Sequence, residues 1–436
     1  MQPDLRRFLP FAVLTTLLPV LAWCQEPMTR LEREERQAML VTVYDDIRKN
    51  YYDPKFHGLD WKARYEDAKD KVAKANTKAE ANLQIAAMLE GLNDSHTHFF
   101  PPRRSVREDY GFFYQMFGDR CFVTHVKPGS DAEAKGLKPG DEVLTINGFA
   151  PTRDSLPKMD YVLRVLYPQI GLRLDLRDPW GKVRKLDVMA KEKEIPLVLT
   201  GVDRWRDGLD RQENYRQEQP SWVRFGDKLM ILRLSNFMMT EVGADGLAET
   251  ARQYGTLIVD LRGNPGGAVN SLKRFLGDLF EQDVKIGDEV KRDKTTAVVT
   301  KGKHDGAFKG KLIVLVDDES ASASEIFSRV MQIEKRGVVV GDVTSGSVMA
   351  AQYFPHTYGT HQVISYGLEL SIADFIMTDG KSLEHAGIIP DEKLLPSQQD
   401  LAAGRDPVLA YAAQQAGVAL APEKAAELFP FEWPRE

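Results

Sequence analysis

The chain has 436 residues and a formal net charge of −6, with 43% hydrophobic and 28% charged residues. This length exceeds one compact core and suits two or three domains, and the composition is that of a folded protein. The acidic balance argues against a general nucleic-acid binder, which needs basic surface to displace counterions. Two cysteines, Cys24 and Cys121, exclude a disulfide framework and a thiolate zinc cluster.

The first 24 residues have the pattern of a secretory signal. Arg6 and Arg7 precede an apolar run, Phe8–Trp23, that is short beside the about 20 residues of a membrane span. An uncleaved N-terminal anchor is the alternative, and Cys24 is a poor lipoprotein acceptor because bulky Trp23 precedes it. We therefore predict a signal peptide over residues 1–24, and a location in the bacterial periplasm or outside the cell.

Apolar residues at helical spacing follow, between residues 29 and 106. One stripe recurs at four-residue steps: Met39, Val43, Ile47 and Tyr51. A second stripe runs from Leu83 to Leu92. These stripes predict packing faces of an N-terminal helical region.

A β-rich block is predicted over residues 109–193. The strand Cys121–Val126 leads to a turn, a short helix at Asp131–Lys135, and the run GLKPGDEVLTING at 136–148. This run resembles the signature of PDZ domains, which bind an extended peptide as an added strand and hold its terminal carboxylate on backbone N–H groups. By position, the carboxylate loop is Tyr110–Phe113. Its peptide-binding residues would be Gly111, Phe112 and Phe113, which could equally form an ordinary first strand.

Beyond an exposed, charge-rich linker predicted at 194–221, apolar strands alternate with helical patterns. The predicted strands are 229–234, 257–261, 312–316 and 338–340, and the predicted helices are 272–280 and 322–333. Such alternation predicts an α/β layer with a mostly parallel sheet, over residues 222–415. A C-terminal tail is predicted at 416–436.

Two loops at the ends of these strands carry residues suited to chemistry. In Asp260–Gly267, the paired glycines Gly266 and Gly267 can direct backbone N–H groups at a developing negative charge. No Gly-Lys-Ser/Thr follows, so the loop is not a phosphate-binding P-loop. The second loop, Asp317–Phe327, holds alternate serines before a helix, and alone it indicates helix capping as readily as catalysis.

Together, in order and spacing, the two loops resemble the S41 peptidases. That family includes the C-terminal processing proteases, interphotoreceptor retinoid-binding protein and the tricorn core. Further matching segments are 231–237, 341–346 and 380–391, so the resemblance covers residues 35–415. It implies a ClpP/crotonase-like α/β peptidase domain with an N-terminal helical segment and an inserted PDZ-like domain. It also implies Ser322 as nucleophile, with an oxyanion hole from the N–H groups of Ala323 and of Gly266 or Gly267.

One position departs from the family pattern. Processing proteases place a lysine base 25 residues after the serine, and here that position is Ser347. A serine hydroxyl cannot deprotonate Ser322 near neutral pH.

A different base is available upstream. Leu92–Thr97 resembles the segment in which the tricorn-like branch carries a catalytic Ser-His pair. By that resemblance His96 is the general base, and Ser95 and the late glutamate Glu384 support it. The alternative for His96 is a histidine that does not act as the base, and the alternative for Glu384 is a solvated loop carboxylate.

These observations predict an exported serine endopeptidase that acts on proteins or peptides, including through their C-termini. No metal, nucleotide or organic cofactor is implied, and His98, His356, His361 and His385 lack metal-ligand spacing. No nucleic-acid partner is expected, and a membrane would be contacted only through an uncleaved N-terminal segment. Ser347 motivates a rival: an inactive pseudopeptidase that binds peptides in the cell envelope. A carrier of small hydrophobic ligands, by analogy with the retinoid-binding relative, is a third hypothesis.

Overall fold

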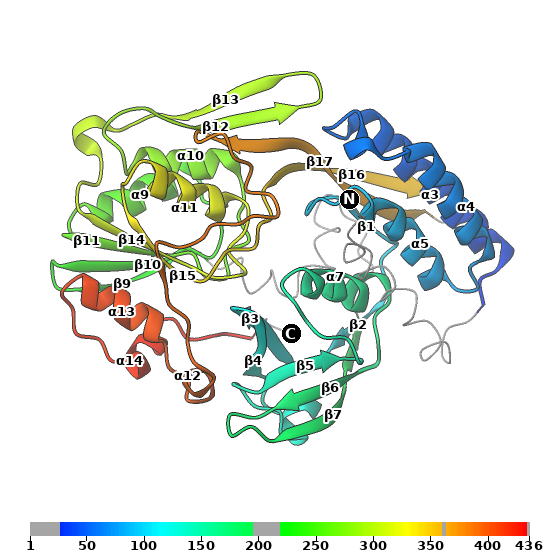
Figure 1. Cartoon of the computed structure of the whole chain (residues 1–436), viewed down its shortest axis with the longest axis horizontal. Coiled ribbons are helices and arrows are strands. Elements are labelled where there is room, and N and C mark those ends of the chain that lie inside the picture. Colours follow the sequence, from blue (N-terminus) through cyan, green and yellow to red (C-terminus); the bar gives the residue numbers. More distant parts are fainter. Residues whose placement is uncertain (1–26, 195–218, 360–362, 434–436) are drawn as a thin grey trace, which may run out of the picture.

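The computed structural model describes residues 27–194, 219–359 and 363–433. The predicted signal peptide and nearly all of the predicted linker lie outside these ranges. Figure 1 shows an α/β layer, a helical unit and a small β-rich unit, with long strands joining the first two. Over the ranges just given, no helix is long and apolar enough to cross a membrane.

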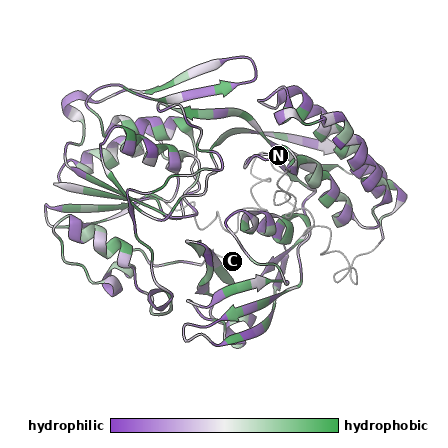
Figure 2. Cartoon of the chain, viewed as in Figure 1, coloured by the Kyte–Doolittle hydropathy of each residue, from purple (hydrophilic) through white to green (hydrophobic). Residues whose placement is uncertain are grey.

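Three helices form the N-terminal unit, and each begins at a side-chain cap. The oxygens of Thr29, Asp60 and Thr77 accept backbone N–H groups of the first helical turns. The helices are α3 (Arg30–Asn50), α4 (Trp61–Lys74) and α5 (Lys78–Glu90). Both predicted stripes are buried in one core, so the helical prediction is confirmed. Figure 2 shows hydrophilic residues on the outer sides of α3 and α4.

The predicted β-rich block contains a five-stranded antiparallel sheet of order β3-β4-β5-β6-β7. Its strands are β3 (Phe112–Phe117), β4 (Arg120–Val126), β5 (Glu142–Ile146), β6 (Gly171–Arg177) and β7 (Val183–Met189). Its helical segments are α6 (Asp131–Ala134), α7 (Ser155–Tyr161) and the π-helix η3 (Val162–Leu166). Strand β2 (Val106–Asp109) pairs with β8 (Lys191–Glu194), so paired strands extend beyond both predicted boundaries.

Side chains alternate across β3, which is an edge strand of that sheet. Phe112, Tyr114 and Met116 are buried in the core of the block, and the residues between them point to the other face. The edge and the second face of β3 are therefore available for contacts with other parts of the chain.

The α/β layer is built on a six-stranded sheet of order β18-β15-β14-β11-β10-β9. Its strands are β9 (Ser221–Phe225), β10 (Leu229–Arg233), β11 (Thr256–Asp260), β14 (Lys311–Val316), β15 (Val338–Gly341) and β18 (Glu392–Lys393). All neighbouring pairs are parallel except β9–β10. The predicted mostly parallel sheet is confirmed, although Ser221 already begins β9.

Helices cover both faces of this sheet. On one face lie α9 (Glu241–Ala251), α10 (Val269–Gly277) and α11 (Ala323–Ile333). The other is covered by α13 (Pro407–Gln415) and α14 (Pro422–Ala426), with α12 (Gln398–Ala402) nearby (Figure 1). Part of the predicted tail 416–436 is therefore core: Ala425 is buried, and Leu428 and Phe429 pack against it.

A second sheet joins the helical unit to the α/β layer. Its strands are β1 (His98–Phe100), β12 (Val284–Lys291), β13 (Thr295–Thr300), β16 (Met349–Tyr358) and β17 (Ile364–Met377). The 14-residue β17 pairs antiparallel with β1, with β12 and with β16. Because β1 directly follows the predicted Ser95–His96 pair, this pairing carries that pair to the α/β layer.

Candidate active site

The glycine loop follows β11 and approaches the serine loop closely. Gly266 and Gly267 have φ angles of 102° and 144°, a region that favours glycine. A Cβ on Gly266 would lie 2.7 Å from the Cβ of Ser322, and one on Gly267 would lie 2.6 Å from the carbonyl oxygen of Phe237. Only glycine allows both approaches.

The serine loop follows β14 and leads into α11. The hydroxyl of Ser320 donates to the carbonyl of Leu261 at 2.8 Å, and that of Ser324 donates to the carbonyl of Asn264 at 3.0 Å. These two serines therefore fasten the serine loop to the glycine loop. Between them, Ser322 has φ 54° and ψ −115°, and it lines a cleft. Strained backbone of this kind clusters at functional sites.

Two backbone N–H groups beside Ser322 have no acceptor among the described residues. They belong to Ala323, at the start of α11, and to Gly267. The N–H of Gly266, by contrast, donates to the Asn264 side chain at 2.8 Å. Of the two glycines considered for an oxyanion hole, Gly266 is therefore already engaged, and Gly267 has the available donor.

A chain of hydrogen bonds joins Glu384, Ser95 and His96. Ser95 Oγ lies 2.7 Å from His96 Nδ1 and donates to Glu384 Oε2 at 3.0 Å. The backbone N–H groups of Ser95 and Val348 also donate to this carboxylate, at 2.7 and 2.8 Å. The structure thus brings together three residues predicted for one site, although 288 positions separate His96 from Glu384.

These bonds determine the protonation pattern of His96. Because Ser95 donates its single hydroxyl proton to Glu384, its oxygen accepts a hydrogen bond from the Nδ1–H group of His96. The other ring nitrogen, Nε2, then carries a lone pair, and within the described ranges it has no hydrogen-bond partner. Burial and the neighbouring His98 lower the pKa of His96 to about 4, against the opposing effect of Asp94, so the ring is neutral at pH 7.

Asp94 fixes the backbone of the same segment. Its carboxylate accepts the N–H of His96 at 3.0 Å and the hydroxyls of Thr97 and Ser371 at 2.9 and 2.7 Å. Because Ser371 belongs to β17, this carboxylate ties the His96 loop to the second sheet.

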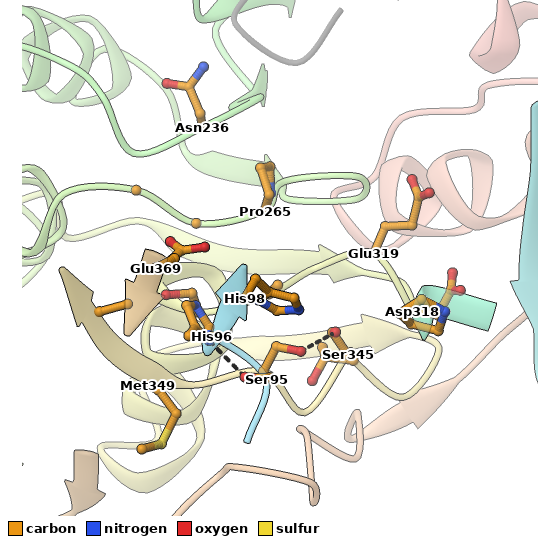
Figure 3. Close-up of a pocket in the computed structure, with 18 of the residues that line it drawn as sticks. Ser95, His96, His98, Asn236, Pro265, Asp318, Glu319, Ser345, Met349 and Glu369 are labelled. Carbon is orange, nitrogen blue, oxygen red and sulfur yellow. Dashed lines mark hydrogen bonds between the residues drawn. The ribbon is translucent and has the colours of Figure 1, made fainter. Parts of the chain in front are cut away.

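Ser95, His96, Gly266, Gly267 and Ser322 line one cavity of about 980 Å³. Figure 3 shows His96 and Ser95, with their hydrogen bond dashed, beside His98 and opposite Pro265. Glu384 does not line the cavity and lies behind Ser95. No hydrogen bond joins the side chains of His96 and Ser322 in the part of the chain described. Catalytic hydrogen bonds are often long without substrate.

Segments of the chain match known protein families. Residues 228–394, which contain both loops and Glu384, match peptidase family S41. We refer to the part of the chain that carries this match as the S41 domain. Residues 32–90 match the tricorn protease C1 domain, and residues 103–164 match the PDZ domain. The matches to the tricorn C1 domain, the PDZ domain and peptidase family S41 thus follow one another along the chain, with the PDZ match in the middle.

Similar proteins include C-terminal processing proteases. The carboxyl-terminal-processing protease of Synechocystis is 24% identical over 413 residues, covering 89% of this chain and 87% of that protein. The tail-specific protease of Haemophilus influenzae is 26% identical over 341 residues, covering 72% of this chain but only 46% of that protein.

Solved structures have the same fold at low identity. Mature CPAF has a TM-score of 0.65 at 14% identity, covering 85% of this chain and 94% of that one. The photosystem II D1 C-terminal processing protease has a TM-score of 0.51 at 20% identity, covering 83% and 93%. The predicted fold class, an S41 α/β domain with N-terminal helices and an inserted PDZ-like domain, is confirmed.

Position 347 of the S41 domain lies beside the serine loop. The carbonyl of Ser347 accepts the N–H of Ser322 at 2.9 Å, and its hydroxyl lies 2.9 Å from that of Ser345. The position therefore supports the loop through its backbone, while its side chain offers no base.

Sequence analysis missed Glu325, which organises this region. Its buried carboxylate accepts the hydroxyl of Thr344 at 2.6 Å and the N–H groups of Ser322, Gly346 and Ser347 at 2.8–3.0 Å. Burial raises the pKa of Glu325 to about 7, against the opposing effect of these four donors. The Ser-x-x-Glu spacing from Ser322 is the signal that could have identified it.

We expect Glu325→Ala to lower the free energy of unfolding by about 3 kcal/mol, because it leaves buried donors without an acceptor. Glu334→Ala, at the exposed C-terminal end of the same helix, is the matched control and should change stability by less than about 0.5 kcal/mol. Urea unfolding of both variants measures the difference. Equal stabilities would contradict a positioning role for Glu325.

The predicted peptide-binding residues lie at the start of β3, outside the cavity. Gly111 donates its N–H to Asp109 at 3.0 Å, and Phe113 contacts the C-terminal segment. Further along the same strand, Tyr114, Gln115 and Met116 do line the cavity. The described residues include no cluster of three or more His, Cys, Asp or Glu that could hold a metal ion.

Proposed function

We propose that this chain is an exported serine endopeptidase that cleaves protein or peptide substrates recognised through its PDZ domain. One observation carries the proposal. The relay from Glu384 through Ser95 to His96 opens into the same cavity as Ser322. A neutral imidazole backed by an oriented hydroxyl and a carboxylate is the arrangement that activates a serine.

In the proposed first step, Ser322 Oγ attacks the substrate carbonyl while His96 Nε2 takes its proton. The resulting imidazolium is stabilised through Ser95 by Glu384. His96 then gives the proton to the leaving amine, and an acyl-enzyme on Ser322 remains until water hydrolyses it.

The tetrahedral intermediate carries its negative charge on the former carbonyl oxygen. We assign its stabilisation to the N–H groups of Ala323 and Gly267, which have no acceptor among the described residues. This replaces the choice between Gly266 and Gly267, since the N–H of Gly266 is held by Asn264.

The PDZ domain contributes directly to the wall of this cavity. Together with Ser322, the cavity is lined by Tyr114–Met116 of β3 and by Leu156, Pro157, Asp160 and Tyr161 of α7. A peptide that adds to the edge of β3 would therefore run towards the nucleophile. This supports entry of substrates through an extended or C-terminal segment, as the names of the processing proteases suggest for those relatives.

The pH dependence of kcat/KM should report the low pKa of His96. The base must be neutral, so activity is expected to persist from pH 8 to about 5.5 and to fall with a midpoint near pH 4. Hydrolysis of a tailed peptide over pH 3.5–8 measures it, with thermal unfolding at each pH as the control. An acid limb at the ordinary imidazole value of about 6.5 would contradict this assignment.

A fluorophosphonate probe tests the proposed function itself. We expect it to label the wild-type chain and to be found on Ser322 by peptide mapping, alongside hydrolysis of casein or a tailed peptide. Secretion is tested separately, by locating the full-length chain in periplasmic and culture fractions.

Ser347 favours a second candidate, a pseudopeptidase that binds peptides without cleaving them. The described residues contain no lysine lining the cavity and no hydrogen bond between His96 and Ser322. Measurable affinity for C-terminal peptides, with no labelling of Ser322 at any pH between 5 and 9, would favour this candidate over the peptidase.

A further inference from the structure

The C-terminal segment joins the S41 domain to the PDZ domain. Leu428 and Phe429 pack against the core beneath the six-stranded sheet. After Pro430, the rings of Phe431 and Trp433 lie on the PDZ domain. Figure 1 shows the segment leaving α14 and ending beside β3. Pro430 alone therefore separates Phe429, which packs against the sheet, from Phe431, which packs against the PDZ domain.

The contact surface on the PDZ domain is formed by Phe113 of β3 and His125 of β4. These residues face each other in the β3–β4 register and lie on the face away from the PDZ core. The ring of Phe431 stacks on His125 at 3.7 Å between centroids, and that of Trp433 stacks on Phe113 at 5.2 Å. Phe431 also meets Phe113 and Trp433 edge-on, at 5.5 and 5.0 Å. Aromatic rings favour these stacked and edge-on geometries.

The same strand also contacts the serine loop. Gln115 Nε2, two residues after Phe113, donates to Asp317 at 2.8 Å and to Asp318 at 2.7 Å. Asp317, which lies in the serine loop, in turn accepts the N–H of Gly263 at 2.9 Å and that of Glu319 at 3.2 Å. The carboxylate touched by the PDZ domain is therefore one that ties the glycine loop to the serine loop.

We propose that the outer face of the β3–β4 hairpin is a binding surface for an aromatic-x-aromatic segment, and that the chain's own residues 431–433 occupy it. Bound there, the segment orients the PDZ domain so that Gln115 reaches Asp317. The segment is thus a built-in ligand that couples PDZ position to the geometry around Ser322. This inference does not require peptidase activity.

Amide hydrogen exchange on the full chain tests it. We expect Phe431→Ala/Trp433→Ala to raise exchange rates about tenfold in 112–126 and in 317–325. Glu432→Ala, which changes the exposed residue between the two rings, is the matched control and should leave both segments unchanged. Phe113→Leu provides a second variant should the double variant not fold, as judged by its thermal unfolding.

A peptide supplied in trans gives an independent measurement. A fluorescent peptide with the sequence of residues 427–436 should bind the chain shortened after Pro430 and restore its protection. The same peptide with alanine at both aromatic positions should not bind. Unaltered exchange in the variants, or no binding of the peptide, would overturn the proposal. Faster exchange confined to 112–126 would overturn the coupling to the serine loop.

Discussion

Ser322→Ala is expected to lower kcat by about 10,000-fold or more, because no other hydroxyl can form the acyl-enzyme from this position. Ser320 and Ser324 hold the loop through hydrogen bonds to carbonyls and cannot take over. The measurement is single-turnover and steady-state hydrolysis of a fluorogenic tailed peptide. KM should change little, since the truncation removes one oxygen.

The matched control is Ser347→Ala, at the position where processing proteases of the family have lysine. Its hydroxyl bonds only to Ser345 among the described residues, so this variant should keep at least about half of the wild-type kcat. Activity that survives Ser322→Ala would remove the nucleophile assignment. Activity lost equally in both variants would point to disruption of the loop.

His96→Asn should lower kcat/KM by about 1,000-fold or more, because it removes the proton acceptor for Ser322. The amide can still accept or donate a hydrogen bond to Ser95, so the segment should remain in place. Steady-state kinetics at pH 7 and at pH 9 measure the loss. Partial recovery at pH 9, where hydroxide can deprotonate the serine, would accompany the loss of a general base.

His98→Asn is the matched control for this variant. His98 lines the same cavity two residues later, but its ring makes an edge-on contact with Tyr161 and has no part in the relay. We expect its kcat/KM to stay within about threefold of wild type. If His98→Asn were as damaging as His96→Asn, the identity of the base would have to be revised.

Sequence patterns predicted the elements of the S41 domain closely. The expected helix at 322–333 corresponds to α11, Ala323–Ile333, and the expected strand at 312–316 corresponds to β14, Lys311–Val316. Apolar runs between glycine-rich turns are strong local signals, and they do not depend on distant contacts. The resemblance of residues 92–97 to the tricorn-like branch singled out Ser95 and His96, whose side chains the fold places beside Glu384.

These local signals could not predict which hydrogen bonds and contacts each residue makes in the fold. The engagement of the Gly266 N–H by Asn264 depends on a turn geometry that glycine spacing alone does not specify. Segment 416–436 likewise has the sequence of a solvated tail. Its aromatic residues are covered by β3, β4 and the six-stranded sheet, which lie far away in the sequence. A single sequence shows which side chains are apolar but not which surface covers them.

The base and the nucleophile belong to different sheets. His96 precedes β1 and is tied through Asp94 to β17, whereas Ser322 follows β14 of the six-stranded sheet. Residues 347 and 348 link the two, because the Ser347 carbonyl accepts the N–H of Ser322 and the N–H of Val348 donates to Glu384 behind Ser95. The spacing of proton acceptor and hydroxyl therefore depends on this two-residue link, and a displacement of the link would separate them while both sheets stay folded.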